Sequence, residues 1–192
     1  MGQDVTGRRS ESQDPRAVRT RKSLVDATVR LLHDYPVADL NVSQIVKEAG
    51  VSRQVFYQHF ADRDALVLAS AQELVVAAYL RFSERFRIDN DFVASVTALM
   101  DPLREHYSAV MHLLDSPIHS RLDNEVYDAM LPTMRDQLRE RAGEQDPQLI
   151  DDMARFYTAG AQSVLEQGIR EHDTPEHIAQ RMEAVRRALI RD

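Results

Sequence analysis

A short stretch of the sequence gathers side chains that can donate hydrogen bonds to phosphates and to the edges of DNA bases. Within seven positions stand Arg53, Gln54, Tyr57, Gln58 and His59. Arginine matches the acceptor pattern of guanine and glutamine matches adenine, while tyrosine and histidine suit the phosphate backbone. If these residues share one face of a helix, that face has the chemistry of a DNA-reading surface. The alternative is a polar helix face that is merely solvated.

The flanking residues predict that this stretch is the second helix of a helix-turn-helix motif spanning residues 41–60. Asn41 can cap a first helix, and Gln44 three residues later completes a capping box. Gly50 stands where that helix needs a left-handed residue to end, and Ser52 can cap the second helix. Two helices joined by a short turn with glycine form a helix-turn-helix. The predicted buried residues of the two helices are Val42, Ile45, Val46, Ala49, Val55, Phe56 and Phe60.

The segment AGVSRQVFYQHFADRDAL resembles the DNA-binding signature of the TetR/AcrR family of bacterial regulators. Upstream, RKSLVDATVRLLHDYPVADLNVSQIV is similar to the family's first helix and the lead into its second, so the likeness covers about residues 20–69. Gln54 stands where the family often has glycine and Val55 where a small residue is common, so base preference does not carry over. The residues that match the signature are Ala49, Gly50, Val51, Ser52, Phe56, Tyr57, His59, Phe60, Arg63 and Leu66.

This resemblance implies a repressor that leaves a palindromic operator when a small apolar or aromatic effector enters its body. We expect no cofactor. Tyr57, His59, Arg63 and Ser43 are expected to hold phosphates, whereas Arg53 and Gln54 are expected to reach base edges. The full set of expected DNA contacts is Ser43, Gln44, Ser52, Arg53, Gln54, Tyr57, His59 and Arg63.

The helical periodicity of the chain predicts an all-α protein of about nine helices. We expect a polar disordered tail at residues 1–15, a DNA-binding head at 16–61 and a helical body at 62–192. Asp62 is expected to cap a long fourth helix whose segment Leu66 to Leu80 is apolar almost all round, so it should be wedged between head and body. Pro102 and Pro132 are expected to bend or interrupt two later helices. Thr174 and Pro175 should open the last helix.

The charge distribution fits a protein that presents one face to DNA. The net charge is −7, yet residues 1–60 hold nine Lys/Arg against seven Asp/Glu, while residues 61–192 hold fifteen against twenty-four. An acidic body with a mildly basic head argues against coating of nucleic acid by the whole surface. The chain has no cysteine, and we expect no stretch long enough to span a membrane. These features predict a cytoplasmic protein.

The middle helices are rich in methionine and tyrosine, which together can form an adaptable apolar pocket. For any single residue, plain core packing is the alternative; the family resemblance favours an effector cavity for the set. The expected pocket residues are Met100, Tyr107, Met111, Tyr127 and Met130. Nearby, His106, His112, Asp115 and His119 cluster within fourteen positions. Imidazole and carboxylate suit zinc, but isolated histidines are mostly structural, so we expect no metal site.

The last two helices carry a pattern suited to a homodimer. Apolar residues spaced four, three and four apart form a narrow seam in the last helix, and small residues in the preceding helix allow close approach of another backbone. A dimer would place two recognition helices roughly 34–36 Å apart, as a palindrome requires. Packing of the seam on the chain's own body is the alternative, above all for Ile178. The expected interface residues are Gly160, Ser163, Ile178, Met182, Val185 and Leu189.

Two other classes of function compete with a DNA-binding regulator. A helical interaction protein would use its long helices to bind a partner, with the head as scaffold. An enzyme would need a catalytic constellation, but the sequence has no H-E-x-x-H, no E-x-x-H pair and no G-x-S-x-G elbow. Catalysis is therefore not expected.

Overall fold

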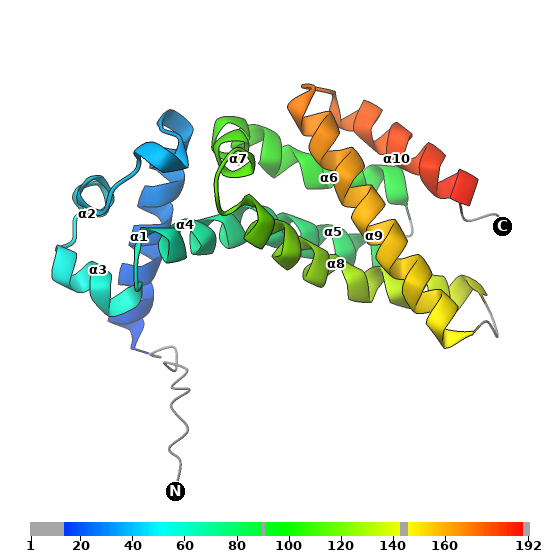
Figure 1. Ribbon diagram of the computed structural model, residues 1–192, viewed down its shortest axis with the longest axis horizontal. Helices are drawn as coiled ribbons and strands as arrows, with labels where there is room; N and C mark the ends of the chain where they lie inside the picture. Colours follow the sequence, from blue (N-terminus) through cyan, green and yellow to red (C-terminus); the bar gives the residue numbers. More distant parts are fainter. Residues whose placement is uncertain (1–13, 90, 143–145, 190–192) are drawn as a thin grey trace, which may run out of the picture.

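A computed structural model describes residues 14–89, 91–142 and 146–189. Over these ranges the regular secondary structure is helical, without strands, which confirms the all-α prediction. If the continuous helix from Arg63 to Asp89 is counted once, the described ranges contain nine α-helices, as expected. Figure 1 shows a small group of helices near the N-terminus connected to a larger helical body. The predicted disordered tail lies outside the described residues, apart from Asp14 and Pro15.

The head consists of α1 (Pro15–Asp34), the 3₁₀ turn η1 (Val37–Asp39), α2 (Val42–Ala49) and α3 (Arg53–His59). Helix α1 starts one residue earlier than expected because Asp14 accepts a hydrogen bond from the Arg16 N–H, 2.9 Å away. The expected capping box is present: Asn41 Oδ1 lies 3.1 Å from Gln44 N, and Gln44 Oε1 lies 2.9 Å from Asn41 N. Gly50 ends α2 with a left-handed φ of 68°. The predicted helix-turn-helix is confirmed.

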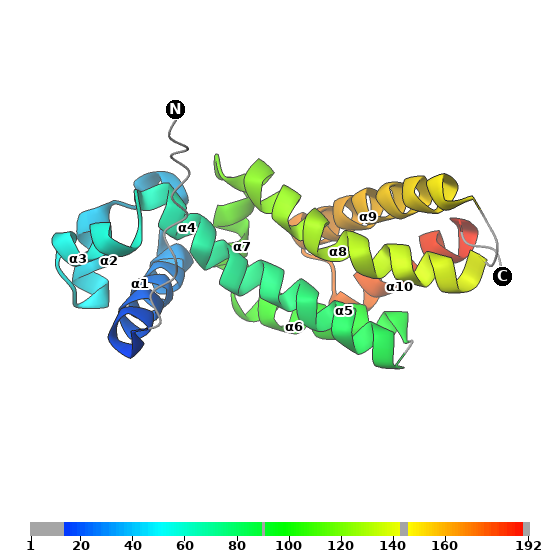
Figure 2. The ribbon, with the colours of Figure 1, turned by 90° about the horizontal axis from the view of Figure 1, so that it is seen from below.

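One continuous helix connects head and body (Figure 2). It comprises α4 (Arg63–Ala71), the π turn η2 (Gln72–Val76) and α5 (Ala77–Asp89), and Asp62 caps it by accepting from Ala65 N at 2.7 Å. Its segment Arg63–Phe86 is long and apolar enough to cross a membrane, contrary to the expectation from sequence. In this fold, 56% of its most apolar window is buried inside the protein. Enclosure by other helices explains that composition.

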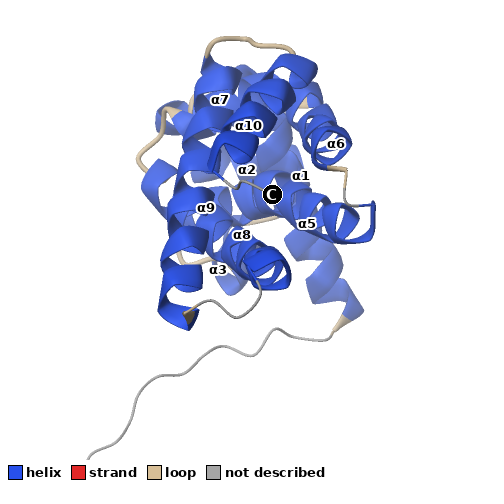
Figure 3. Cartoon of the chain, turned by 90° about the vertical axis from the view of Figure 1, so that its right-hand side faces the viewer, coloured by secondary structure: helices blue, strands red, loops and turns tan. Residues whose placement is uncertain are grey.

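The body contains α6 (Phe92–Glu105), α7 (Tyr107–Leu114), α8 (His119–Ala142), α9 (Pro147–Arg170) and α10 (Pro175–Leu189). Figure 3 views the molecule from the end opposite the head, so the helices of the body lie in front of those of the head. The helix is interrupted at His106, between α6 and α7 and four residues after Pro102, whereas α8 continues through Pro132. Thr174 Oγ1 accepts from His177 N at 3.2 Å, so the predicted start of α10 is confirmed.

Head and body share apolar packing. Phe56 belongs to a small core that α1, α2 and α3 form with Leu66 of α4, whereas Leu32, Val37 and Leu40 belong to the large core of the body. Helix α1 packs against both α4 and α7. The head is therefore attached through α1 and η1 as well as through α4.

The α9–α10 pair packs closely because Gly168 has no side chain. A Cβ added at Gly168 would lie 2.6 Å from Cγ1 and 2.8 Å from Cδ1 of Ile178, which is fully buried. Because Ile178 is fully buried, a methyl group at position 168 requires either this side chain or the two helices to shift against close packing.

We predict that Gly168→Ala lowers the free energy of unfolding by about 1–3 kcal/mol through overpacking. Gln167→Ala in the same helix is the control, because Gln167 is exposed. The control should change the free energy of unfolding by less than about 0.5 kcal/mol, as is usual for surface substitutions. Urea unfolding of both variants at one protein concentration provides the comparison, and equal midpoints would contradict the packing argument.

Candidate nucleic-acid interface

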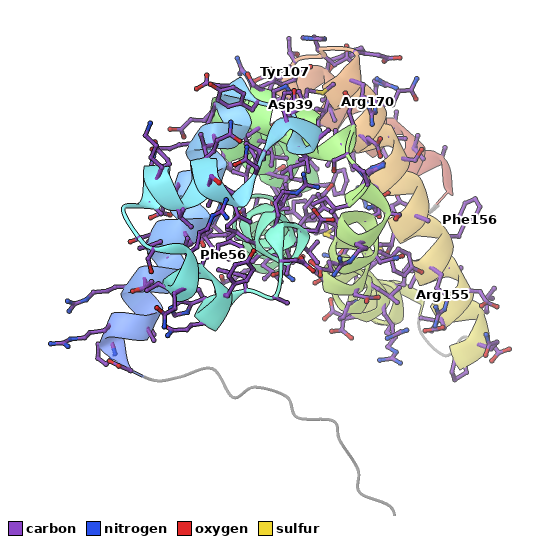
Figure 4. All side chains as sticks on the ribbon, turned by 60° about the vertical axis from the view of Figure 1, so that its left-hand side comes forward. Asp39, Phe56, Tyr107, Arg155, Phe156 and Arg170 are labelled. Atoms are coloured by element: carbon purple, nitrogen blue, oxygen red, sulfur yellow. The ribbon has the colours of Figure 1, made fainter. Side chains whose placement is uncertain are left out.

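Helix α3 is held in the head by its aromatic residues. Phe56 is fully buried and Phe60 is 5% exposed, and their ring centroids are 6.1 Å apart. Figure 4 shows Phe56 inside the group of head helices. Arg21 of α1 places its guanidinium carbon 5.0 Å from the Phe60 ring centroid, which adds a cation–π contact. Packing of the buried face, which contains Phe56 and Phe60, therefore fixes the orientation of the opposite face of α3.

The exposed face of α3 contains the side chains expected to contact DNA. Arg53, Gln54 and Tyr57 are exposed, Tyr57 at 52%, whereas His59 is half-buried. Arg53 Nη2 donates a hydrogen bond to Ser43 Oγ of α2. The structure thus brings a residue expected to read bases next to one expected to hold a phosphate, and α2 and α3 present one continuous polar surface.

Two of the expected contact residues also maintain the helix starts. Ser52 Oγ accepts from Val55 N at 3.2 Å, and the Gln44 amide oxygen accepts from Asn41 N. In both residues the side-chain oxygen is used as an acceptor within the head. The Ser52 hydroxyl and the Gln44 amide N–H groups remain available to donate hydrogen bonds to phosphate oxygens.

Arg63 has intramolecular partners in this structure. Its Nη1 donates to the Leu40 carbonyl at 3.0 Å, and its Nε donates to Asp64 Oδ1 at 2.9 Å. These bonds connect the start of α4 to the residue before the α2 cap. The expected phosphate contact stays a prediction, and it would require this side chain to exchange or share these partners.

Comparison with known proteins connects this geometry to a family. The family model of bacterial regulatory proteins of the tetR family matches residues 24–70, the stretch from the middle of α1 to α4. Over these residues the chain matches the TetR family. The HTH-type transcriptional regulator BetI of Cronobacter sakazakii is 29% identical over 101 residues, 50% of each chain. The chain thus spans about half the length of this curated relative.

Solved structures share the fold over most of the chain. NalD, the secondary repressor of the MexAB-OprM multidrug efflux pump in Pseudomonas aeruginosa, has a TM-score of 0.64 at 17% identity, covering 92% of this chain and 99% of NalD. SmeT, the repressor of the Stenotrophomonas maltophilia multidrug efflux pump SmeDEF, has a TM-score of 0.62 at 19% identity, with 88% of each chain covered. SmeT has also been solved in complex with triclosan. At these identities the likeness concerns the fold.

The body of the chain contains a small, partly open cavity of about 40 Å³. Its wall is mostly apolar, and polar groups from α8 and α9 stand on one side. Helix η2 contributes Val75 and α5 contributes Tyr79, so the helix that enters the head also lines the cavity. The lining residues are Val75, Tyr79, Leu103, Val110, Leu114, Leu122, Asp123, Val126, Gln162, Leu165, Glu166 and Ile169.

None of the five residues expected to form the effector pocket lines this cavity. Met100 and Met130 are buried in the main core, where their flexible side chains fill space between helices. The Tyr107 hydroxyl donates to the Ile169 carbonyl at 3.1 Å. Met111 and Tyr127 are half-buried. The cavity is lined instead by other residues of α6, α7 and α8 together with residues of η2, α5 and α9, a combination that helical periodicity alone does not predict.

The four residues weighed as a metal cluster are directed to different partners. His106 Nδ1 lies 2.9 Å from Nε2 of His33, and His112 Nδ1 lies 2.8 Å from the Leu32 carbonyl. Asp115 accepts from Arg170 Nη1 at 2.6 Å. His119 faces Asp123 and Glu166. The first two contacts link α1 of the head to the α6–α7 corner of the body, a connection that sequence analysis missed.

The expected dimer residues separate into buried and exposed groups. Ile178 is fully buried and Met182 is 8% exposed, so both pack mainly on the chain's own body, as the alternative interpretation anticipated for Ile178. Gly160, Ser163 and Val185 are exposed. The side chain of Leu189 lies outside the described residues.

An apolar groove joins two of the exposed residues, Gly160 and Val185. It has a volume of about 190 Å³ and lies between α9 and α10, with Phe92 of α6 at its floor. Phe156 is 69% exposed and points away from the body (Figure 4). Sequence analysis missed Phe156, although its position four residues before Gly160 on α9 places both on one helix face. The groove is lined by Phe92, Phe156, Tyr157, Gly160, Ala161, Val164, Met182 and Val185.

The exposed position of Gln54 generates a test of base reading. Gln54→Ala should weaken binding to a cognate duplex by about 1–3 kcal/mol and relax the preference at one base pair, because a bidentate contact is lost. Tyr57→Phe should weaken cognate and random duplexes alike, since a phosphate contact carries no sequence information. Gln180→Ala removes an exposed glutamine from α10 and should change neither. Fluorescence anisotropy on operator variants distinguishes these effects; an unchanged base preference in Gln54→Ala rejects its role.

Proposed function

We propose that this protein is a sequence-specific transcriptional regulator that acts in the cytoplasm as a homodimer. It represses from a palindromic operator and leaves the operator when a small apolar or aromatic molecule enters its body. The observation that carries the proposal is the exposed polar face of α3, whose other face is fixed in the head core. The TetR-family match of residues 24–70 supports the same conclusion.

The cavity supports a ligand-responsive body. At about 40 Å³ it holds little more than one water molecule, so an effector must widen it. Val75 and Tyr79 lie on the helix that continues into α4, and α4 packs on α1 of the head. Widening of the cavity therefore acts on the element that orients the head. The structure of SmeT with triclosan is a precedent in a protein of the same fold.

The groove between α9 and α10 supports the dimer. Phe156 and Val185 are large apolar side chains exposed to water beside the small residue Gly160. Exposed aromatic and aliphatic side chains grouped around a groove are typical of a protein–protein interface. A two-fold axis through this face would bring α9 and α10 of both subunits into one four-helix contact.

A duplex-binding assay decides between a regulator and a helical interaction protein. Genomic fragments from the source organism are incubated with the protein, and the retained fragments are sequenced and searched for a palindrome. The proposal requires nanomolar binding to a small set of fragments at two salt concentrations. Equal, strongly salt-dependent retention of random fragments would instead favour non-specific binding, and no retention would favour the interaction protein.

We predict that Phe156→Asp and Val185→Asp dissociate the dimer. Each substitution places a charge without a partner in a contact that excludes water, which costs several kcal/mol. Because about 1.4 kcal/mol corresponds to a tenfold change in affinity, this cost should greatly weaken dimerisation. Leu80→Asp is the matched control, because Leu80 is 53% exposed on α5 and does not line the groove. Sedimentation should show monomers for the first two variants and a dimer for the control. A dimer with full operator affinity in all three variants would place the interface elsewhere.

We predict reciprocal coupling between effector and operator. Thermal shift with a panel of apolar aromatic compounds, triclosan included, selects a ligand, and calorimetry then measures its affinity with and without operator DNA. The affinity should fall in the presence of DNA by the same factor by which the ligand weakens DNA binding. A ligand affinity that is identical in both titrations contradicts allosteric release while leaving DNA binding intact.

A further inference from the structure

Three potential metal-binding atoms converge between α8 and α9. Nε2 of His119 lies 3.2 Å from Asp123 Oδ2 and 3.2 Å from Glu166 Oε2. The three ligand atoms all lie within 4.8 Å of one another. His119 and Asp123 are one turn apart on α8, and Glu166 comes from α9, which packs along α8. All three side chains are half-buried, so they are not simply solvated surface groups.

These separations suit a single ion. Nitrogen and carboxylate ligands bind Zn²⁺ at about 2.0–2.2 Å, so ligand atoms at tetrahedral angles around one ion lie about 3.3–3.6 Å apart. The two distances from His119 already fall close to this range. An ion at the centre would require the carboxylates to rotate until the third separation, between Asp123 and Glu166 and at most 4.8 Å, also falls within this range.

Each carboxylate is oriented by a second partner. Gln162 Nε2 donates to Asp123 Oδ1 at 3.1 Å, and Arg170 Nε donates to Glu166 Oε1 at 2.9 Å. In both residues the outer oxygen is held and the other oxygen is turned toward His119. This division of the two oxygens is typical of metal sites, where outer hydrogen bonds fix the ligands.

The cluster also faces the cavity. Asp123 and Glu166 belong to its lining, together with Tyr79. The Tyr79 side chain is 7% exposed, and its hydroxyl makes no hydrogen bond to the described part of the chain. A tyrosine hydroxyl is protonated at neutral pH. A neutral hydroxyl at this place can bond a water or ligand atom in the cavity.

We propose that His119, Asp123 and Glu166 bind one divalent transition-metal ion of the Zn²⁺, Co²⁺ or Ni²⁺ class, with a coordination position open to the cavity. Mixed imidazole and carboxylate donors suit these ions, and the absence of cysteine disfavours Cu⁺. The ion connects α8 to α9 at the cavity wall. The competing explanation is a protonated imidazole that forms ion pairs with both carboxylates and binds no metal.

Metal titration of the full-length chain tests the site independently of any DNA binding. The protein is stripped with a chelator, dialysed and titrated with Co²⁺, whose visible absorption reports coordination, and with Zn²⁺ by calorimetry. One ion should bind per chain, and Zn²⁺ should raise the melting temperature. His119→Gln should lower the affinity at least tenfold and abolish the Co²⁺ spectrum.

His177→Gln is the matched control. His177 of α10 pairs through Nδ1 with Oδ1 of Asp173, which precedes that helix, at 2.9 Å. This histidine–carboxylate pair lies outside the metal-binding group found among the described residues, so the variant should bind Co²⁺ like the unchanged chain. If His119→Gln fails to fold by circular dichroism, Asp123→Asn replaces it with the same expectation. Gln162→Ala should keep one ion per chain but weaken its affinity. Absence of one-to-one binding in the unchanged chain, or equal affinity in the folded ligand variant and the control, overturns the proposal in favour of the ion pairs.

Discussion

The fold depends on the enclosure of one helix. The helix from Arg63 to Asp89 is apolar around much of its circumference, and burying such a surface is the largest favourable contribution that a helix can make to folding. Helices α1, α6 and α8 pack around its three segments. Asp62 caps the start of this helix, and Asp91, just beyond its end, caps the start of α6. These two polar residues mark the limits of the buried apolar segment. A change that leaves one side of this helix open would affect head and body together.

The local structure of the head could be predicted because its signals are short in range. Asn41, Gln44, Gly50 and Ser52 act within one helical turn, through hydrogen bonds and a left-handed φ that depend on neighbours in sequence. Residue type alone therefore determines the turn and the helix starts. Once the turn and the helix starts are set, burial of Phe56 and Phe60 fixes the rotation of α3 about its axis. This rotation determines which side of α3 is exposed.

The cavity and the contacts between elements could not be predicted in the same way. Met100 and Asp123 lie on helices whose periodicity was recognised, yet which side chains leave a void depends on how several helices meet. The His33–His106 and His112–Leu32 contacts join residues 73 and 80 positions apart. Similarly, Ile178 of the predicted dimer seam on α10 packs against Gly168 of α9, so this part of the seam faces the chain's own body. Such distances come from tertiary packing, and a single sequence contains no local signal for them.

The shared core of Leu32, Val37 and Leu40 bears on how the protein melts. These residues belong to the head by sequence but are buried with the side chains of the body. Separating the two parts would expose them to water, so neither part has a complete core of its own. Head and body should then lose structure in one cooperative transition, with matching unfolding curves from probes in α3 and α9. A fragment cut after residue 61 would also lack α4, the packing partner of α1, and would be much less stable than the whole chain.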